Sequence, residues 1–505
     1  MTSSALDLVH AVVDPGSWRC WDEPVGPVDE LTGDAEYQDD LRAARERSGL
    51  DESVVTGEGR IQGRRVAVVV CEFRFLAGSI GVVAGERLVR AVERATAERL
   101  PLLAAPASGG TRMQEGTVAF LQMVKVAAAI TDHKAAGLPY LVYLRHPTTG
   151  GVLASWGSLG HVTAAEPGAL IGFLGPRVHQ ALYGEEFPAG VQVAENLLAN
   201  GLVDAVLPAE RLGGVAARAL RVLCGEGGPQ GAEAGVPQGV SRVPSAERSI
   251  RLSRLPQRPG IRALLDATAT DVSPLSGTGA GERDPGLLLA LARVGGTPCV
   301  VLGHDRGDHN DGPGQALGPA GLRSARRGMR IAAELGLPLL TVVDTAGAAL
   351  SRDAEEGGLA GEIARCLAEL VTLPAPTLCL LLGQGAGGAA LALLSADRVV
   401  AARHAWLSPL PPEGASAILY RTTERAYEIA ERQGVRSADL LRDGIVDVVV
   451  EEGEDEGGEN GSGYGEFLGR LGALLGAELA ALARRDPAER LAARRARYRR
   501  IGLPG

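Results

Sequence analysis

The stretch that decides the fold of this chain is Ser108-Gly109-Gly110-Thr111-Arg112-Met113-Gln114-Glu115-Gly116, which follows an apolar run beginning Pro101-Leu102-Leu103. A second glycine-rich stretch, Thr149-Gly150-Gly151-Val152, comes later in the same half of the chain. Glycine lets the backbone adopt positive φ and approach a ligand closely. Two turns at a fixed separation can direct backbone N–H groups at one point, as in a preorganised oxyanion hole.

The second half of the chain repeats this pattern. Asp344-Thr345-Ala346-Gly347 follows Pro338-Leu339-Leu340, and Ala386-Gly387-Gly388-Ala389 comes later. The separation of Gly388 from Gly347 equals that of Gly150 from Gly109. Each half ends with a related apolar segment, at 201–206 and 444–449, and we expect both segments to be strands. A repeat of about 240 residues is too long for a solenoid unit, so we expect two homologous domains.

Apolar strand-like runs alternate with helical periodicity in the first half. The pattern predicts strands at 66–70, 101–105 and 140–144, and helices at 37–47, 86–99 and 113–136. Such alternation is typical of an α/β fold.

The composition suggests the domain limits. We expect a lead-in at 1–50, a first domain at 51–224, a Gly- and Pro-rich linker at 225–248, a second domain at 249–480 and a basic C-terminal helix at 481–505. An acidic, Gly-rich loop is expected at 451–466. The arginines of the C-terminal helix either bind an anion or pair with nearby acidic residues.

Charge and composition exclude several classes of protein. The 505 residues carry a net charge of -10, which argues against a nucleic-acid partner. No apolar run approaches the length of a membrane span, and residues 1–15 lack the pattern of a signal peptide, so we expect a cytoplasmic protein. The six cysteines form no C-x-x-C pair, so we expect them to be reduced and to bind no metal.

The residues of these motifs resemble those of a known protein family. The first half is similar to the β subunit of bacterial acetyl-CoA carboxylase carboxyltransferase in the segments 14–17, 75–81, 108–116, 146–152 and 164–178. The second half resembles the α subunit of the same enzyme in 256–259, 303–304, 344–348, 354–356, 362–365 and 412–416. The resemblance implies a β–α fusion of two tandem crotonase-like (ClpP/crotonase) domains.

The resemblance also implies an activity. In this family CO2 passes from carboxybiotin, on a separate biotin carboxyl carrier protein, to acetyl-CoA, giving malonyl-CoA for fatty acid synthesis. The biotin ureido nitrogen takes the α-proton of the thioester, so no side-chain base is required. The chain has no biotinylation motif and no ATP-grasp pattern, so biotin carboxylase must be a separate partner, and a homo-oligomer is expected.

Site residues follow from the same resemblance. It implies that Gly150 and Gly151 stabilise the acyl-CoA enolate, and that Gly388 and Ala389 bind the biotin ureido oxygen. We further expect substrate contacts from Gly109, Gly110, Gly347 and Ala348. From the glycines alone, two purely structural turns remain an alternative.

The chain also departs from the family pattern. Ala346 stands where Pro is typical, Gln384 stands where Glu is typical, and the segment 305–311 is acidic instead of basic. These changes leave the choice of acyl-CoA open. They also leave open two other functions: a decarboxylase-type carboxyltransferase acting on a malonyl thioester, and a non-catalytic scaffold paralogue.

The family's β subunit usually carries a four-cysteine zinc ribbon, whereas only Cys20 lies in the corresponding region here. Since a structural zinc site needs four ligands, we predict that the protein requires no zinc. Metal analysis and activity assays after chelation will check this, and stoichiometric, activity-linked zinc would contradict it.

Overall fold

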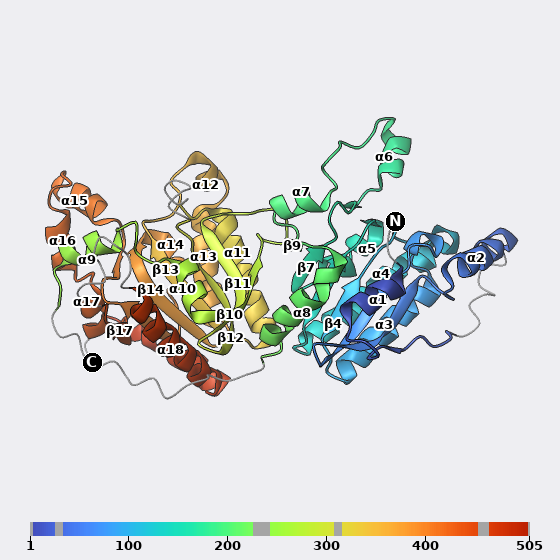
Figure 1. Ribbon diagram of the computed structural model, residues 1–505. Coiled ribbons are helices and arrows are strands. Elements are labelled where there is room, and N and C mark those ends of the chain that lie inside the picture. Colours follow the sequence, from blue (N-terminus) through green and yellow to red (C-terminus); the bar gives the residue numbers. More distant parts are fainter. Residues whose placement is uncertain (1–3, 26–33, 226–242, 308–315, 453–463, 503–505) are drawn as a thin grey trace. The chain divides into compact units, whose positions relative to one another are not determined.

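The computed structural model describes residues 4–25, 34–225, 243–307, 316–452 and 464–502 (Figure 1). It divides into two compact units. Unit 1 comprises Met1–Leu220 with Gly279–Gly281, and unit 2 comprises Arg221–Thr278 with Glu282–Gly505. Most of the expected linker, the centre of the expected acidic loop and the acidic segment from Asp308 onward lie outside the described residues.

Unit 1 is built on a seven-stranded sheet in the order β1-β2-β3-β4-β5-β7-β9. The first two pairings are antiparallel and the others are parallel. A separate parallel pair joins β6 to β8. The elements are α1 (Ala5–Val12), β1 (Arg19–Cys20), α2 (Ala35–Ser48), β2 (Val54–Ile61), β3 (Arg64–Cys71), a 3-10 turn (Leu76–Gly78), α3 (Val82–Ala97), β4 (Leu102–Ala105), a 3-10 turn (Met113–Glu115), α4 (Gly116–Ala135), β5 (Tyr140–Leu144), β6 (Thr148–Thr149), α5 (Gly150–Leu153), a 3-10 turn (Trp156–Ser158), β7 (Val162–Ala165), β8 (Ile171–Gly172), α6 (Pro176–Tyr183), α7 (Ala194–Ala199), β9 (Ala205–Val206) and α8 (Ala209–Leu223).

Unit 2 repeats this architecture. Its main sheet has the order β10-β11-β12-β13-β14-β15-β17, with an antiparallel start, parallel pairing from β12 onward, and β16 added beside β14. The elements are α9 (Ala246–Ser253), α10 (Ile261–Thr268), β10 (Ala269–Leu275), β11 (Leu287–Val294), β12 (Thr297–His304), α11 (Pro319–Leu335), β13 (Leu339–Thr345), α12 (Arg352–Glu356), α13 (Leu359–Thr372), β14 (Thr377–Ala386), α14 (Gly387–Ala392), β15 (Arg398–Ala402), β16 (Trp406–Ser408), α15 (Pro412–Tyr420), α16 (Ala426–Gln433), α17 (Ser437–Arg442), β17 (Val448–Val450), α18 (Tyr464–Ala483) and α19 (Pro487–Arg500).

The central strands are apolar along their whole length because both faces of a parallel sheet are covered. In β4 and β5 every residue is buried, and in β13 likewise. The predicted strands at 66–70, 101–105 and 140–144 are confirmed. The helix predicted at 113–136 is present, but its first three residues form a 3-10 turn, since Gly116 with φ 62° interrupts the helical backbone.

The apolar segments at 201–206 and 444–449 contain shorter strands than we expected. Strand β9 begins only at Ala205 and β17 only at Val448. Before each strand, an aspartate accepts a backbone N–H from the neighbouring strand: Asp204 from Thr163 at 2.9 Å and Asp447 from Val399 at 2.7 Å. Each aspartate also donates its own N–H to the carbonyl of the same residue, Thr163 at 2.7 Å and Val399 at 2.8 Å, and the residues before it form turns and bends.

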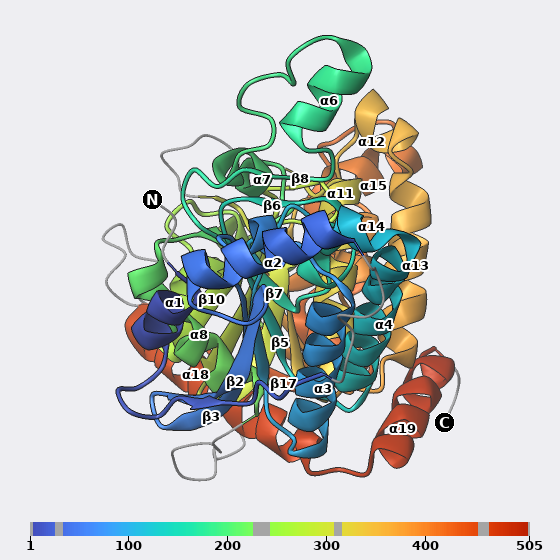
Figure 2. The same cartoon turned by 90° about the vertical axis from the view of Figure 1, so that its right-hand side faces the viewer.

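The first residues of the chain are part of unit 1. Helix α1 buries Leu8, Val9 and Val12, and β1 pairs with β2 at the edge of the sheet. Later in the same unit, α6 projects away from the rest of unit 1 in both views (Figures 1 and 2). No helix in the described part of the chain is long and apolar enough to cross a bilayer.

The basic C-terminal helix α19 is anchored inside unit 2. Arg494 is buried and forms a two-pronged ion pair with Asp397, with N–O distances of 2.8 and 2.7 Å. The same guanidinium donates to the carbonyls of Leu370, Leu373 and Ala375. Arg497 likewise pairs with Asp447 at 2.5 Å. These arginines therefore pair within the protein, as in the second of the two interpretations above.

This anchor predicts a stability effect. Replacing Arg494 by Met leaves the buried Asp397 without its closest cation, so we expect a loss of about 3–5 kcal/mol in unfolding free energy. Arg495→Met on the exposed side of α19 should change it by less than about 0.5 kcal/mol. Urea unfolding followed by circular dichroism measures both. An Arg494→Met protein as stable as the control would show that the buried pair contributes little.

Candidate active site

The first glycine-rich turn leaves the end of β4 and is closed by its own serine. The Ser108 Oγ accepts the N–H of Gly110 at 3.0 Å, and Gly110 has a φ of 110°, which favours glycine. The N–H of Gly109 donates to the carbonyl of Ala77 at 2.9 Å. Both glycine N–H groups are thus used within the fold, and their part is to shape the turn.

The second turn is bonded directly to the first. The N–H of Thr149 donates to the Ser108 carbonyl at 2.9 Å, and the N–H of Gly150 donates to the Phe173 carbonyl at 2.9 Å. Gly150 has a φ of 62° and starts α5, a helix of a single turn. A Cβ on Gly110 would come within 3.3 Å of the Gly151 nitrogen, so the two turns touch through backbone atoms.

Two N–H groups stay available beside these turns. Within the described part of the chain, neither the Gly151 nor the Thr111 N–H has a hydrogen-bond acceptor. At Gly151 this follows from its place in the first turn of α5, where the N–H groups have no intrahelical partner. Thr111 forms a parallel β-bridge with Ile80. The hydrogen bonds of this bridge join Ile80 to Gly110 and Arg112, the residues on either side of Thr111, and leave the Thr111 N–H unused. A Cβ at Gly151 would lie 3.4 Å from Thr111 Oγ1, so the N–H groups of Gly151 and Thr111 lie close to each other.

Unit 2 contains the same arrangement. The Thr345 Oγ1 accepts the N–H of Gly347 at 3.1 Å, and Gly347 has a φ of 138°. Ala348 bridges Leu317 as Thr111 bridges Ile80. Gly387, with a φ of 67°, starts α14, and Gly388 follows it as Gly151 follows Gly150. The turn is complete although Ala346 replaces the proline typical of the family.

The backbone also gives the register of the internal repeat. The positive-φ glycines of the first turns are Gly110 and Gly347, and those of the second turns are Gly150 and Gly387, with the same separation in both pairs. The equal spacings noted in the sequence therefore join residues that are not equivalent, because Gly109 corresponds to Ala346. The counterpart of Gly150 and Gly151 in unit 2 is Gly387 and Gly388, and Ala389 corresponds to Val152.

The sequence reasoning named Ala348 but missed its counterpart Thr111. A signal existed, since both residues directly follow the positive-φ glycine of their turn. Aligning the two halves at Gly110 and Gly347 would have found it.

A buried ion-pair network holds the first turn from behind. Arg112 pairs with the buried Glu52 and lies 3.3 Å from Glu115. Glu115 accepts the Tyr37 hydroxyl at 2.5 Å and the N–H of Val82, the first residue of α3, at 2.6 Å. Residues 112–115 of the motif therefore connect the turn to α2 and α3.

The histidines near the motifs accept hydrogen bonds from the backbone. His146 Nδ1 accepts the N–H of Leu170 at 3.1 Å, which stabilises the loop before the second turn. His304 is buried, and burial lowers its pKa to about 4, so it is neutral near pH 7. Its Nδ1 accepts the Asp344 N–H at 3.4 Å. In the part of the chain that the structure describes, no cluster of His, Cys, Asp or Glu is arranged to hold a metal ion.

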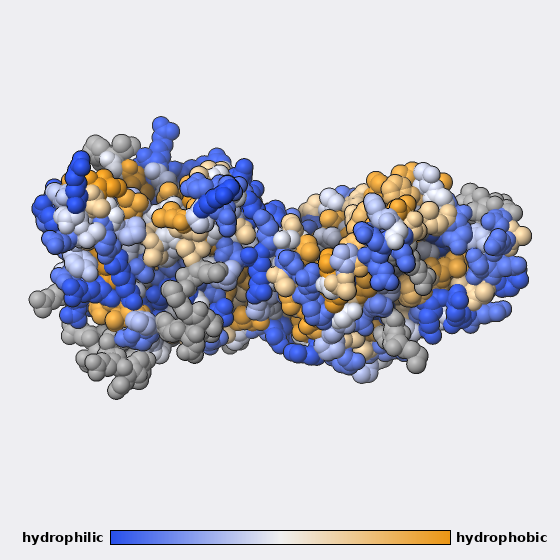
Figure 3. Space-filling view, turned by 90° about the horizontal axis from the view of Figure 1, so that it is seen from above, coloured by the Kyte–Doolittle hydropathy of each residue, from blue (hydrophilic) through white to orange (hydrophobic). Residues whose placement is uncertain are grey.

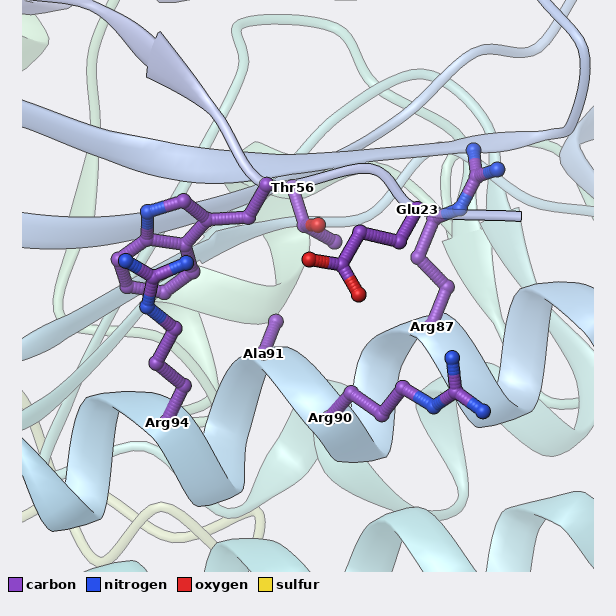
Figure 4. A pocket seen from close by; sticks show the side chains of 7 residues that line it. Glu23, Thr56, Arg87, Arg90, Ala91 and Arg94 are labelled. Carbon is purple, nitrogen blue, oxygen red and sulfur yellow. The ribbon is translucent and has the colours of Figure 1, made fainter. Parts of the chain in front are cut away.

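A small hollow of about 80 Å³ lies elsewhere on unit 1 and contains none of the turn residues (Figure 4). Its lining is Trp21, Glu23, Thr56, Arg87, Arg90, Ala91 and Arg94. Each arginine is already paired with a carboxylate, as Arg87–Asp51, Arg90–Glu86 and Arg94–Glu98, at 2.7, 3.0 and 2.8 Å. We assign no ligand to this hollow because its arginines are paired within unit 1.

Solved structures define the fold of the protein. The chain superposes on transcarboxylase 12S, solved as a hexamer assembly with hydrolysed methylmalonyl-CoA, with a TM-score of 0.72 and 21% identity over 96% of this chain and 90% of that one. A single-chain, multi-domain long-chain acyl-CoA carboxylase matches with a TM-score of 0.67 and 18% identity over 89% of this chain and 44% of that one. The predicted tandem crotonase-like α/β fold is confirmed.

Sequence relatives place the chain in a family. A family model described as the carboxyl transferase domain matches residues 26–452. The chain is 61% identical to a probable biotin-dependent acyl-CoA carboxylase beta3 subunit of Mycobacterium tuberculosis, over 98% of both chains. It is 40% identical to the acetyl-CoA carboxylase carboxyl transferase subunits beta/alpha of Salinispora arenicola, over 87% of this chain and 81% of that one. The chain therefore belongs to the carboxyl transferase domain family, among the β subunits of biotin-dependent acyl-CoA carboxylases.

Proposed function

We propose that this protein transfers CO2 from carboxybiotin, held on a separate carrier protein, to acetyl-CoA, and that both reacting groups are held by backbone N–H donors. The observation that carries the proposal is the pair of equivalent turns, each with an unpaired N–H at Gly151 or Gly388 among the described residues. Preorganised backbone donors of this kind stabilise an oxygen on which negative charge develops. Carboxybiotin supplies the CO2 and, as the resemblance implies, the base.

In unit 1, Gly151 and Thr111 would bind the thioester oxygen as the enolate forms. Gly110 and Gly150 would keep the two turns close together, because a Cβ on either would lie 3.5 Å or less from the opposite turn. In unit 2, Gly388 and Ala348 would bind the ureido oxygen of biotin, with Ala389 next to them in α14. The chain's own residues would thus orient both substrates and move no proton.

Acetyl-CoA is the proposed acceptor because a relative at 40% identity is named an acetyl-CoA carboxylase. The relatives at 61% identity are named only for acyl-CoA, so a longer acyl chain is the competing choice. The intact turn at Thr345 and Gly347 favours an enzyme over a scaffold. We further propose a fused β–α organisation, a biotin carboxylase and a biotin carboxyl carrier protein as partners, and a cytoplasmic role in fatty acid synthesis.

Carboxylation of free biotin by malonyl-CoA, with methylmalonyl-CoA in parallel, tests the proposal. An active protein that prefers malonyl-CoA supports it, and a protein inactive with both would support the scaffold. The forward reaction with biotin carboxylase, carrier protein, ATP and bicarbonate then separates a carboxylase from a decarboxylase-type enzyme.

Apolar side chains around the turns support a homo-oligomer. Each unit, taken alone, exposes large apolar residues at equivalent positions of the repeat, and Figure 3 shows apolar surface on both units. The matched pairs are Met113 and Leu350, Leu182 and Ile418, and Tyr183 and Leu419. Exposed apolar patches mark interaction surfaces. A second copy that presents its unit 2 to unit 1 of the first would cover both sets, and we propose that the active site forms between protomers.

The donor role of Gly151 predicts a kinetic defect. A Cβ there would already contact Met123 at 3.3 Å, and Val in place of Gly151 would occupy the approach to its N–H. We expect Gly151→Val to fold and to lose roughly 10²–10³ in kcat for biotin carboxylation. Gly214→Val on α8, where the new Cβ meets nothing within 4 Å, is the matched control. Near-normal kcat in a folded Gly151→Val protein would contradict the assignment.

A site between protomers predicts complementation. Gly151→Val and Gly388→Val chains should each be inactive, and mixing them should restore activity because one interface of the hybrid carries two intact turns. Subunit exchange is followed by mass spectrometry of differently tagged chains, and folding of each parent by circular dichroism. Exchange without recovery of activity would place the whole site within one chain.

A further inference from the structure

Arg254 connects two segments of unit 2 that meet beside its glycine turn. The residue follows α9 directly, and its guanidinium forms a two-pronged ion pair with Glu413, with N–O distances of 2.6 and 3.0 Å. Its Nε donates to the side-chain oxygen of Gln384 at 3.2 Å. Glu413 lies in the first turn of α15, and Gln384 lies on β14 two residues before Ala386, which caps α14.

The main chain of Gln384 is held from its other side. Its N–H donates to the Oδ1 of Asp344 at 3.0 Å. Asp344 is buried and forms an ion pair with Arg306 at 2.9 Å, and a Cβ at Gly383 would collide with its carboxylate. The end of β14 is therefore fixed by Asp344 through the backbone and by Arg254 through the side chain.

The internal repeat separates what the fold requires from what unit 2 has added. In the register set by Gly110 and Gly347, the equivalent residues of unit 1 are Ala107 for Asp344 and Pro147 for Gln384, neither of which carries a charge. Beyond the second turns the register shifts by one residue, because α6 and α15 begin at Pro176 and Pro412, so Arg177 takes the place of Glu413 and no carboxylate stands there. Unit 1 nevertheless builds the same turn with the same positive-φ glycines. The network of Asp344, Gln384 and Glu413 is thus not needed to form the second turn, which points to a role in what unit 2 binds.

We propose that Arg254 is a positioning residue: by joining Gln384 to Glu413 it fixes the second glycine turn against α15 and so controls reaction with biotin. This rests on the proposed function, which gives unit 2 the biotin. Arginine suits the role because its planar fork can bond two acceptor groups in a set geometry, whereas the lysine ammonium cannot. The Arg254 side chain is one-third exposed, so its loss buries no unpaired charge and the protein should fold.

The test compares Arg254→Ala, Arg254→Lys and Glu413→Gln in the full-length protein, by kinetics of free biotin carboxylation from malonyl-CoA. A turn displaced by a fraction of an ångström should lower kcat/KM for biotin roughly ten- to hundredfold, with KM for malonyl-CoA unchanged. Arg254→Lys should fall between Ala and wild type. Arg254 and Glu413 act through one contact. A double variant that combines Arg254→Ala with Glu413→Gln should therefore have the same kcat/KM for biotin as Arg254→Ala alone.

Arg251→Ala is the matched control. Arg251 lies one turn earlier on α9, where its mostly exposed side chain pairs with Glu247 at 2.7 Å, and its loss should leave both substrates unaffected. Wild-type biotin kinetics in Arg254→Ala would overturn the inference. Equal losses for both substrates with a lowered melting temperature would also overturn it, because that result indicates a structural role alone. If wild type carboxylates no biotin from any acyl-CoA, the proposed function fails and the inference falls with it.

Discussion

Both halves of this protein depend on one constraint: a backbone N–H must point outward without a partner at the end of a buried parallel strand. Unpaired backbone donors are costly wherever water cannot reach them, so proteins avoid them. Here the neighbouring donors of Gly109, Gly110 and Gly150 all have partners. The N–H groups of Gly151 and Thr111 have no partner within the described turns of unit 1, and a substrate oxygen could bond them.

Several features serve this constraint. The side chains of Ser108 and Thr345 close their turns locally, so the turns do not depend on a distant partner. The one-turn helix α5 is too short to rely on a macrodipole, so the proposed function rests on the direction of its N–H groups. The Arg112 network ties the first turn to α2 and α3, which explains why charged residues directly follow the glycines.

Much of the fold could be predicted from the sequence because the signals are local. Apolar runs gave the strands at 66–70, 101–105 and 140–144, and helical periodicity gave α3 and α4. The segments at 201–206 and 444–449 were misjudged because the chain forms turns and bends up to Asp204 and Asp447, which an apolar pattern does not reveal. The site could be located from its glycines, but its free donors could not be identified. Whether an N–H is free depends on partners such as Ala77 and Phe173, which only the folded chain brings close.

The internal repeat makes each half a reference for the other. Where the halves agree, as in the positive φ of Gly110 and Gly347 or of Gly150 and Gly387, the feature belongs to the shared turn. Where they differ, the support of the turn has changed while its backbone has not. Unit 1 stabilises its turn through Arg112 and Glu52, whereas unit 2 uses Asp344 within the strand end and Arg254 across to α15. Departures such as Ala346, inside the first turn, and Gln384, before the second turn, therefore leave both turns formed in unit 2. The geometry of its donors is kept because it depends on Thr345, Gly347 and Gly387.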